Sequence, residues 1–160
     1  MTLRTGNVST TPVPETAAGS DLWRRWSAAW LGAVALALVN AAVREVAYVD
    51  TVGEQAAHQI ATIALILLLG AYVALLERLW PIPSLRQALA IGFTWAAATV
   101  AFEFGFGVAT GVDLSEIVAN YNLADGKLWV LVPVAIAFMP AAVAGPEARG
   151  PRVEHHPPGG

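Results

Sequence analysis

The sequence AAHQIATIALILLLGAYVALLERL occupies residues 56–79, and no charged side chain interrupts it between Ile60 and Leu76. An α-helix rises about 1.5 Å per residue, so a run of about 20 apolar residues crosses the roughly 30 Å hydrocarbon layer of a bilayer. The run ends before the WPIP sequence at residues 80–83, where prolines lack the amide donor that a continuing helix needs. We therefore predict a transmembrane helix here.

Three further apolar stretches flank this one in the sequence. They are predicted to form spans at about residues 26–48, 85–106 and 128–144. The last contains Pro133 and Pro140, and we expect a kinked helix there, because neighbouring membrane helices can satisfy the freed carbonyls. The connection at residues 107–127 is expected to contain a short helix capped by Asp113. The predicted fold class is all-α, an integral membrane four-helix bundle.

The composition favours the same class. Of the 160 residues, 56% are hydrophobic and 13% are charged, and the mean hydropathy is +0.57. Soluble proteins carry roughly 25% charged residues. This length allows one membrane domain, residues 23–145, between a disordered N-terminal leader at residues 1–22 and a disordered C-terminal tail at residues 146–160. The net charge of −3, without a basic stripe, argues against a nucleic-acid partner.

Lysine and arginine are distributed unequally between the two sides of the predicted bundle. Four spans place seven of them on one side and two, Arg44 and Lys127, on the other; the seven are Arg4, Arg24, Arg25, Arg78, Arg86, Arg149 and Arg152. The positive-inside rule then predicts that both termini are cytoplasmic. The apolar run after Arg25 could also begin a cleaved secretory signal, but the long preceding segment and the three following apolar segments argue against cleavage.

This topology places most of the polar span residues at one depth, near the outer surface. Residues four apart share a helix face, and three such polar pairs occur: Asn40 with Arg44, His58 with Thr62, and Thr99 with Glu103. We therefore predict an outward-facing polar pocket. Its predicted residues are Asn40, Arg44, Glu45, His58, Gln59, Thr62, Glu103, Tyr121 and Asn122.

Charged groups in this pocket are expected to pair, because an unpaired charge in hydrocarbon costs several kcal/mol. We expect Arg44 to bind Glu103 in a bidentate contact, with Glu45, His58 and Lys127 extending the network. Three interpretations stay open. The polar groups hold a small bundle together, they form a functional pocket, or they reach water separately by snorkelling.

Four motifs follow one another along the chain: NxxxRE at residues 40–45, HQxxT at 58–62, FEFxFG at 102–107 and YNxxxGxLW at 121–129. This series resembles the pattern of a family of small, uncharacterised bacterial membrane proteins with four predicted spans. The resemblance implies the four-span architecture and a bacterial inner membrane, and it implies no reaction. One departure is Ala61, where the family pattern has a serine beside Thr62.

Three classes of function are compatible with these residues. Binding or assembly is favoured, because small residues such as Ala33 and Ala37 let helices approach closely, within the bundle, in a homo-oligomer or in a larger membrane complex. A transporter or proton relay using Glu103, His58 and Arg44 is the second class. It is less favoured because the inner halves of the spans are almost wholly apolar and give no continuous polar path. The third is a hydrolase-like enzyme with His58 as general base and Glu103 or Glu45 as its partner.

No cofactor and no metal are predicted. The chain has no cysteine, which excludes disulfides and thiolate metal sites. Two of its three histidines are the adjacent His155 and His156 in the tail, a weak signal for metal binding. The lipid bilayer is therefore the partner that the sequence predicts most directly.

Overall fold

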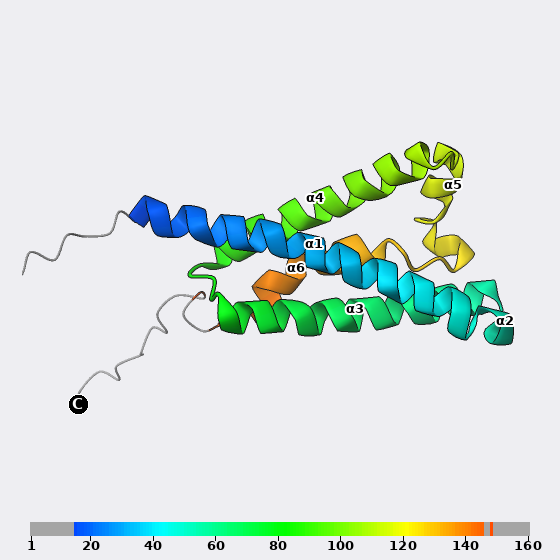
Figure 1. The fold of residues 1–160 in the computed structure, drawn as a ribbon, viewed down its shortest axis with the longest axis horizontal. Coiled ribbons are helices and arrows are strands. Elements are labelled where there is room, and N and C mark those ends of the chain that lie inside the picture. Colours follow the sequence, from blue (N-terminus) through cyan, green and yellow to red (C-terminus); the bar gives the residue numbers. More distant parts are fainter. Residues whose placement is uncertain (1–14, 146–147, 149–160) are drawn as a thin grey trace, which may run out of the picture.

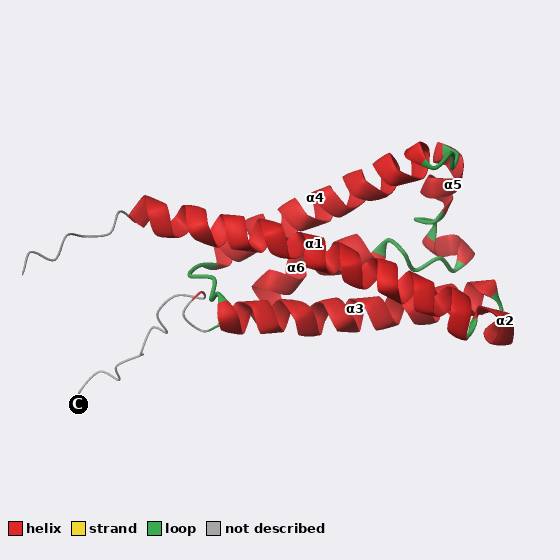
Figure 2. Ribbon diagram, viewed as in Figure 1, coloured by secondary structure: helices red, strands yellow, loops and turns green. Residues whose placement is uncertain are grey.

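The computed structural model describes residues 15–145 and Ala148, and the described residues form helices and no strand (Figures 1 and 2). The predicted all-α class is confirmed. The helices are α1 Glu15–Ala47, α2 Val49–Val52, α3 Glu54–Leu79, α4 Leu85–Ala109, α5 Leu114–Ala119, the 3-10 helix η1 Leu123–Asp125, and α6 Leu131–Val143.

Four helices lie along one long axis: α1, α3, α4 and α6 (Figure 1). Each of them runs antiparallel to the one before it in the chain. Helix α6 packs against α3 and α4, and α1 packs against the same two helices. One end of the molecule, here called the α5 end, carries α2, α5 and η1. The other, here called the loop end, carries the α3–α4 connection and the end of α6.

Within the described residues, three helices are long and apolar enough to cross a membrane: Gly19–Ala47 within α1, Glu54–Leu79 and Leu85–Ala109. The predicted fourth span is shorter than expected. Helix α6 has 13 residues, or about 20 Å of length. It begins late because the peptide groups of residues 128–132 form tight turns, in which Leu131 N–H donates to Leu128 O and Val132 N–H to Trp129 O, both over 2.9 Å.

The surface of the long helices is apolar. In α1 only 11% of the most apolar 18-residue window is buried inside the protein. Val46 and Leu67 are 86% and 69% exposed. Soluble monomers rarely expose apolar areas on this scale, so the surface favours contact with lipid.

The helix boundaries follow local signals in the sequence. Ser84 caps α4 by accepting the Gln87 N–H over 3.3 Å. The predicted helix after Asp113 is present as α5, although the Asp113 side chain makes no capping hydrogen bond. Helix α1 begins at Glu15, inside the predicted leader. Residues 1–14 and, apart from Ala148, the predicted tail lie outside the described residues.

The core is densest toward the loop end, where tryptophan side chains join three segments. Trp26 is fully buried, and its indole N–H donates to Trp80 O over 3.3 Å. The Trp95 indole N–H donates to Trp26 O over 3.0 Å. These bonds satisfy both indoles while α1, α4 and the α3–α4 connection pack together.

Helices α4 and α6 are in tight contact at Gly92. A Cβ atom built there lies 2.8 Å from the carbonyl carbon of Ala137, closer still to its oxygen, and 3.1 Å from Ile136 O. Pro140 lies inside α6 and has no N–H to donate to Ile136 O. The Ile136 carbonyl oxygen therefore receives no hydrogen bond from residue 140, and it lies against Gly92 of α4. Glycine at position 92 therefore sets the distance between the two helices.

Candidate functional site

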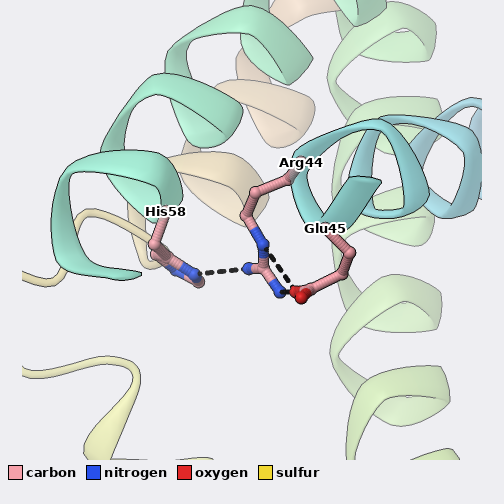
Figure 3. A network of polar contacts seen from close by, with 3 residues as sticks. All are labelled: Arg44, Glu45 and His58. Atoms are coloured by element: carbon pink, nitrogen blue, oxygen red, sulfur yellow. Dashed lines mark hydrogen bonds and ion pairs between the residues drawn. The ribbon is translucent and has the colours of Figure 1, made fainter. Parts of the chain in front are cut away.

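The predicted polar residues of α1 and α3 meet at the α5 end. Arg44 Nη1 donates to His58 Nδ1 over 3.0 Å, and Arg44 Nε donates to Glu45 Oε1 over 3.0 Å, with Nη2 on the same oxygen (Figure 3). One turn earlier on α1, Asn40 Nδ2 donates to Ala61 O over 3.0 Å. Side chains thus join α1 and α3 at the α5 end.

The contact with Arg44 fixes the tautomer of His58. A guanidinium has only donors, so Nδ1 of the imidazole accepts and the ring proton of the neutral form lies on Nε2. Among the residues that the structure describes, this Nε2 is the buried side-chain nitrogen or oxygen that has no hydrogen-bond partner. A buried donor without an acceptor costs about 1–3 kcal/mol. An acceptor that enters this site recovers that cost.

A second polar group surrounds Glu103 on α4. Glu103 Oε2 accepts the Trp129 indole N–H over 2.7 Å and also the hydroxyl of Tyr121. Burial, together with the hydrogen bond to Glu103 and its charge, raises the pKa of Tyr121 well above its usual value. Tyr121 therefore stays protonated and keeps donating to the carboxylate.

The expected ion pair between Arg44 and Glu103 is wrong. Arg44 binds Glu45 and His58, whereas Glu103 binds Trp129 and Tyr121. The reason is local, because Glu45 adjoins Arg44 in the sequence and α4 diverges from α1 toward this end (Figure 1). The two groups are nevertheless neighbours, since the rings of His58 and Trp129 lie 6.2 Å apart.

Three other predicted residues mainly support the backbone. Gln59 Nε2 donates to Gly126 O over 2.9 Å, which fastens the η1 segment to α3. Thr62 donates to His58 O within its own helix, over 2.8 Å. Asn122 Oδ1 accepts the Ala124 N–H over 3.1 Å and caps η1. Neither Thr62 nor Asn122 lines a cavity of the α5 end.

A polar pocket of about 420 Å³ opens at this end. Its lining includes Arg44 and His58, which the sequence predicts as site residues, and several that it does not: Glu54, Gln55, Asn120, Asp125, Gly126 and Lys127. Lys127 Nζ donates to Asn120 Oδ1 over 3.4 Å. Positive and negative side chains therefore face one small volume.

An apolar cavity of about 340 Å³ lies between α1 and the half of α4 nearer the α5 end. Ala33, Ala37 and Ala41 line it from α1, and Phe102 and Phe106 from α4. Leu65 and Leu69 of α3 and Val132 and Ile136 of α6 also line it. At the α5 end it reaches the polar residues Glu103, Asn120 and Trp129. This volume lies within the range of small-molecule sites.

The small residues of α1 have two different roles here. The predicted role is close helix approach, and Ala29 and Ala33 are buried in the core. Ala33 also lines the apolar cavity, and Ala37 and Ala41, one and two turns further along, line it without being buried, because α4 has moved away. The spacing of four residues from Ala33 to Ala41 is the sequence signal that places them on one face.

In the described part of the chain, no group of three or more His, Cys, Asp or Glu side chains could hold a metal ion. The predicted weak candidate, His155 with His156, lies outside that part. Comparisons with protein-family models, with curated proteins and with solved structures find no match to this chain. The site therefore has to be interpreted from its own chemistry.

Proposed function

We propose that this chain is a multi-pass protein of the bacterial inner membrane that binds a lipid-like ligand, with the apolar tail of the ligand in the cavity between α1 and α4. One observation carries the proposal. The 340 Å³ cavity is lined by alanine, leucine and phenylalanine side chains, lies between two helices long and apolar enough to span a membrane, and ends at Glu103 and Trp129.

The proposed topology has four crossings, with α6 as a short fourth one. Its 13 residues pack against α3 and α4, so neighbouring helices cover it where it is too short to reach both interfaces. The excess of lysine and arginine in the predicted inner connections supports cytoplasmic termini. In this orientation the α5 end, with both cavities, faces outward.

Binding is favoured over a proton relay because the polar side chains gather at one end. Toward the loop end, the cavity is followed by the buried apolar side chains of Val73 and Ile91. Binding is also favoured over catalysis by His58. Arg44 occupies the Nδ1 lone pair of that imidazole and the proton lies on Nε2, so His58 acts as a donor in this arrangement rather than as a base.

The proposal is tested by labelling with a phospholipid that carries a photoreactive group in its acyl chain. The protein is reconstituted in nanodiscs and the adducts are mapped by mass spectrometry. We expect saturable labelling of the cavity residues Ala37 and Ile136, which excess unlabelled lipid suppresses. Labelling of Leu67, on the outer face of α3, is expected to stay unsaturated, because bulk lipid exchanges there.

Filling the cavity provides the matched variants. Ala37→Trp is expected to remove the saturable labelling of Ile136, whereas Ala35→Trp, on the exposed face of the same helix, leaves it unchanged. Equal, unsaturated labelling of all apolar faces contradicts a lipid site. Saturable labelling that persists in Ala37→Trp places the site elsewhere and contradicts the cavity.

A further inference from the structure

The apolar cavity and the polar pocket are neighbours, because Asn120 lines both of them. The His58 and Trp129 rings, 6.2 Å apart, lie one on each side of this junction, since His58 lines the polar pocket and Trp129 the apolar cavity. A single ligand that occupies both volumes must have an apolar tail and a polar head.

Three residues that carry N–H donors line the polar pocket, and they come from different segments. Arg44 comes from α1, His58 from α3, and Lys127 from the segment before α6. Lys127 has three N–H donors and gives one to Asn120, and the His58 Nε2–H is buried without a partner. Guanidinium, ammonium and imidazole N–H groups together suit a phosphate, which offers several charged acceptor oxygens.

Two carboxylates line the same pocket. Glu54 lies in the first turn of α3, and Asp125 ends η1, where it accepts the Asn122 side-chain N–H over 2.7 Å. Both repel a second negative charge and attract a cation. The mixture of charges therefore favours a headgroup that carries a phosphate and an ammonium over one that is only anionic.

We infer that the ligand is a glycerophospholipid with a zwitterionic phosphate–ammonium headgroup. Its phosphate binds Arg44, Lys127 and the His58 Nε2–H, and its ammonium faces Glu54 and Asp125. This inference rests on the proposed function, because it assigns the head of the lipid whose tail lies between α1 and α4. The pocket of about 420 Å³ holds such a headgroup.

The test is a competition among lipids with identical acyl chains. Nanodiscs contain equal amounts of phosphatidylethanolamine, phosphatidylglycerol and diacylglycerol, and native mass spectrometry measures which lipid stays on the released protein. We expect phosphatidylethanolamine to exceed diacylglycerol roughly tenfold, the contribution of one charge-assisted hydrogen bond. Phosphatidylglycerol is expected to fall between them.

Variants assign the two charges. Lys127→Met, or Lys127→Gln should the first not fold, is expected to reduce the preference for phosphate lipids over diacylglycerol. Glu54→Gln is expected to shift the preference from phosphatidylethanolamine toward phosphatidylglycerol. Arg86→Met, which removes an exposed arginine at the loop end, leaves both ratios unchanged. A merely structural loss lowers the binding of all three lipids together and leaves the ratios as they are.

Other outcomes separate the two proposals. Equal retention of all three lipids overturns the headgroup inference while the photolabelled tail site stands. A preference for phosphatidylglycerol over phosphatidylethanolamine overturns the ammonium assignment. Absence of any retained lipid, together with unsaturated photolabelling, overturns the proposed function as well.

Discussion

The loop end and the α5 end of this molecule differ in whether their buried polar groups have hydrogen-bond partners. At the loop end, the carboxylate of Glu77, 8% exposed, accepts the Ile82 N–H over 3.2 Å and the Gly145 N–H over 3.5 Å. At the α5 end, the donor on His58 Nε2 is buried without a partner, beside two cavities. Among the described residues, Glu77 at the loop end thus has hydrogen-bond partners, whereas the α5 end holds an unpaired donor beside two cavities.

This difference teaches where stability and function are located. Close packing and paired polar groups stabilise a fold, whereas unfilled space and unpaired donors cost free energy that a ligand can return. The glycines of α4 repeat the contrast. The Cβ built at Gly92 meets the backbone of α6, but the one built at Gly107 meets side chains, first the tip of Ile117 at 2.5 Å.

The largest expected effect comes from adding a methyl group to α4 at its tight contact with α6. Gly92→Ala is expected to lower the free energy of unfolding by about 3 kcal/mol, because a helix backbone cannot yield as a side chain can. Gly107→Ala is expected to cost less than about 1 kcal/mol, since Ile117 can change rotamer. Both are measured by tryptophan fluorescence during unfolding in mixed micelles.

Gly105→Ala is the control on the same helix, because a Cβ there meets nothing within 4 Å. It is expected to leave stability unchanged or to raise it by less than about 1 kcal/mol, the usual gain in a helix. If Gly107→Ala proves as damaging as Gly92→Ala, the α5 end is packed as rigidly as the loop end, and the contrast between the two ends fails.

The sequence predicts the long helices well because their signals are local. The prolines at residues 81 and 83 and the cap at Ser84 define the end of α3 and the start of α4, and both bounds agree with the predicted 79 and 85. The start of α6 is less accurate. Apolar composition does not distinguish the turns at residues 128–130 from helix, so the prediction begins there rather than at Leu131.

The site is predicted only in part, because partners depend on how helices diverge. Arg44 and His58 do lie together. The expected pairing of Arg44 with Glu103 required α1 and α4 to stay close toward the α5 end. Within the described part of the chain, their last side-chain hydrogen bond in that direction joins the Trp30 indole N–H to Thr99 Oγ1 over 3.2 Å. An alanine in a cavity wall and an alanine in a packed core look the same in the sequence, so the sequence does not show which of the two roles an alanine has. Glu77 gives no signal of its buried role, since glutamates at span ends usually reach water.

A smaller effect is expected from removing the carboxylate that closes the loop end. Glu77→Leu leaves the buried Ile82 N–H without its acceptor and is expected to cost about 2 kcal/mol of unfolding free energy. Arg78→Leu, at the exposed neighbouring position, is expected to change stability by less than about 0.5 kcal/mol. Comparable losses in the two variants contradict a special role for Glu77 in holding the loop end.

The smallest effect concerns coupling within the α5 end, and it distinguishes its two polar groups. In a double-mutant cycle, Arg44→Met and His58→Phe are expected to couple by about 1 kcal/mol, the net contribution of the hydrogen bond that joins them. Arg44→Met and Glu103→Gln are expected to add within about 0.5 kcal/mol, because they share no partner. If instead Arg44→Met couples with Glu103→Gln and adds with His58→Phe, Arg44 binds Glu103 in the membrane. That result also removes the argument that His58 Nε2 carries the proton offered to a ligand, since that tautomer depends on Arg44 occupying Nδ1.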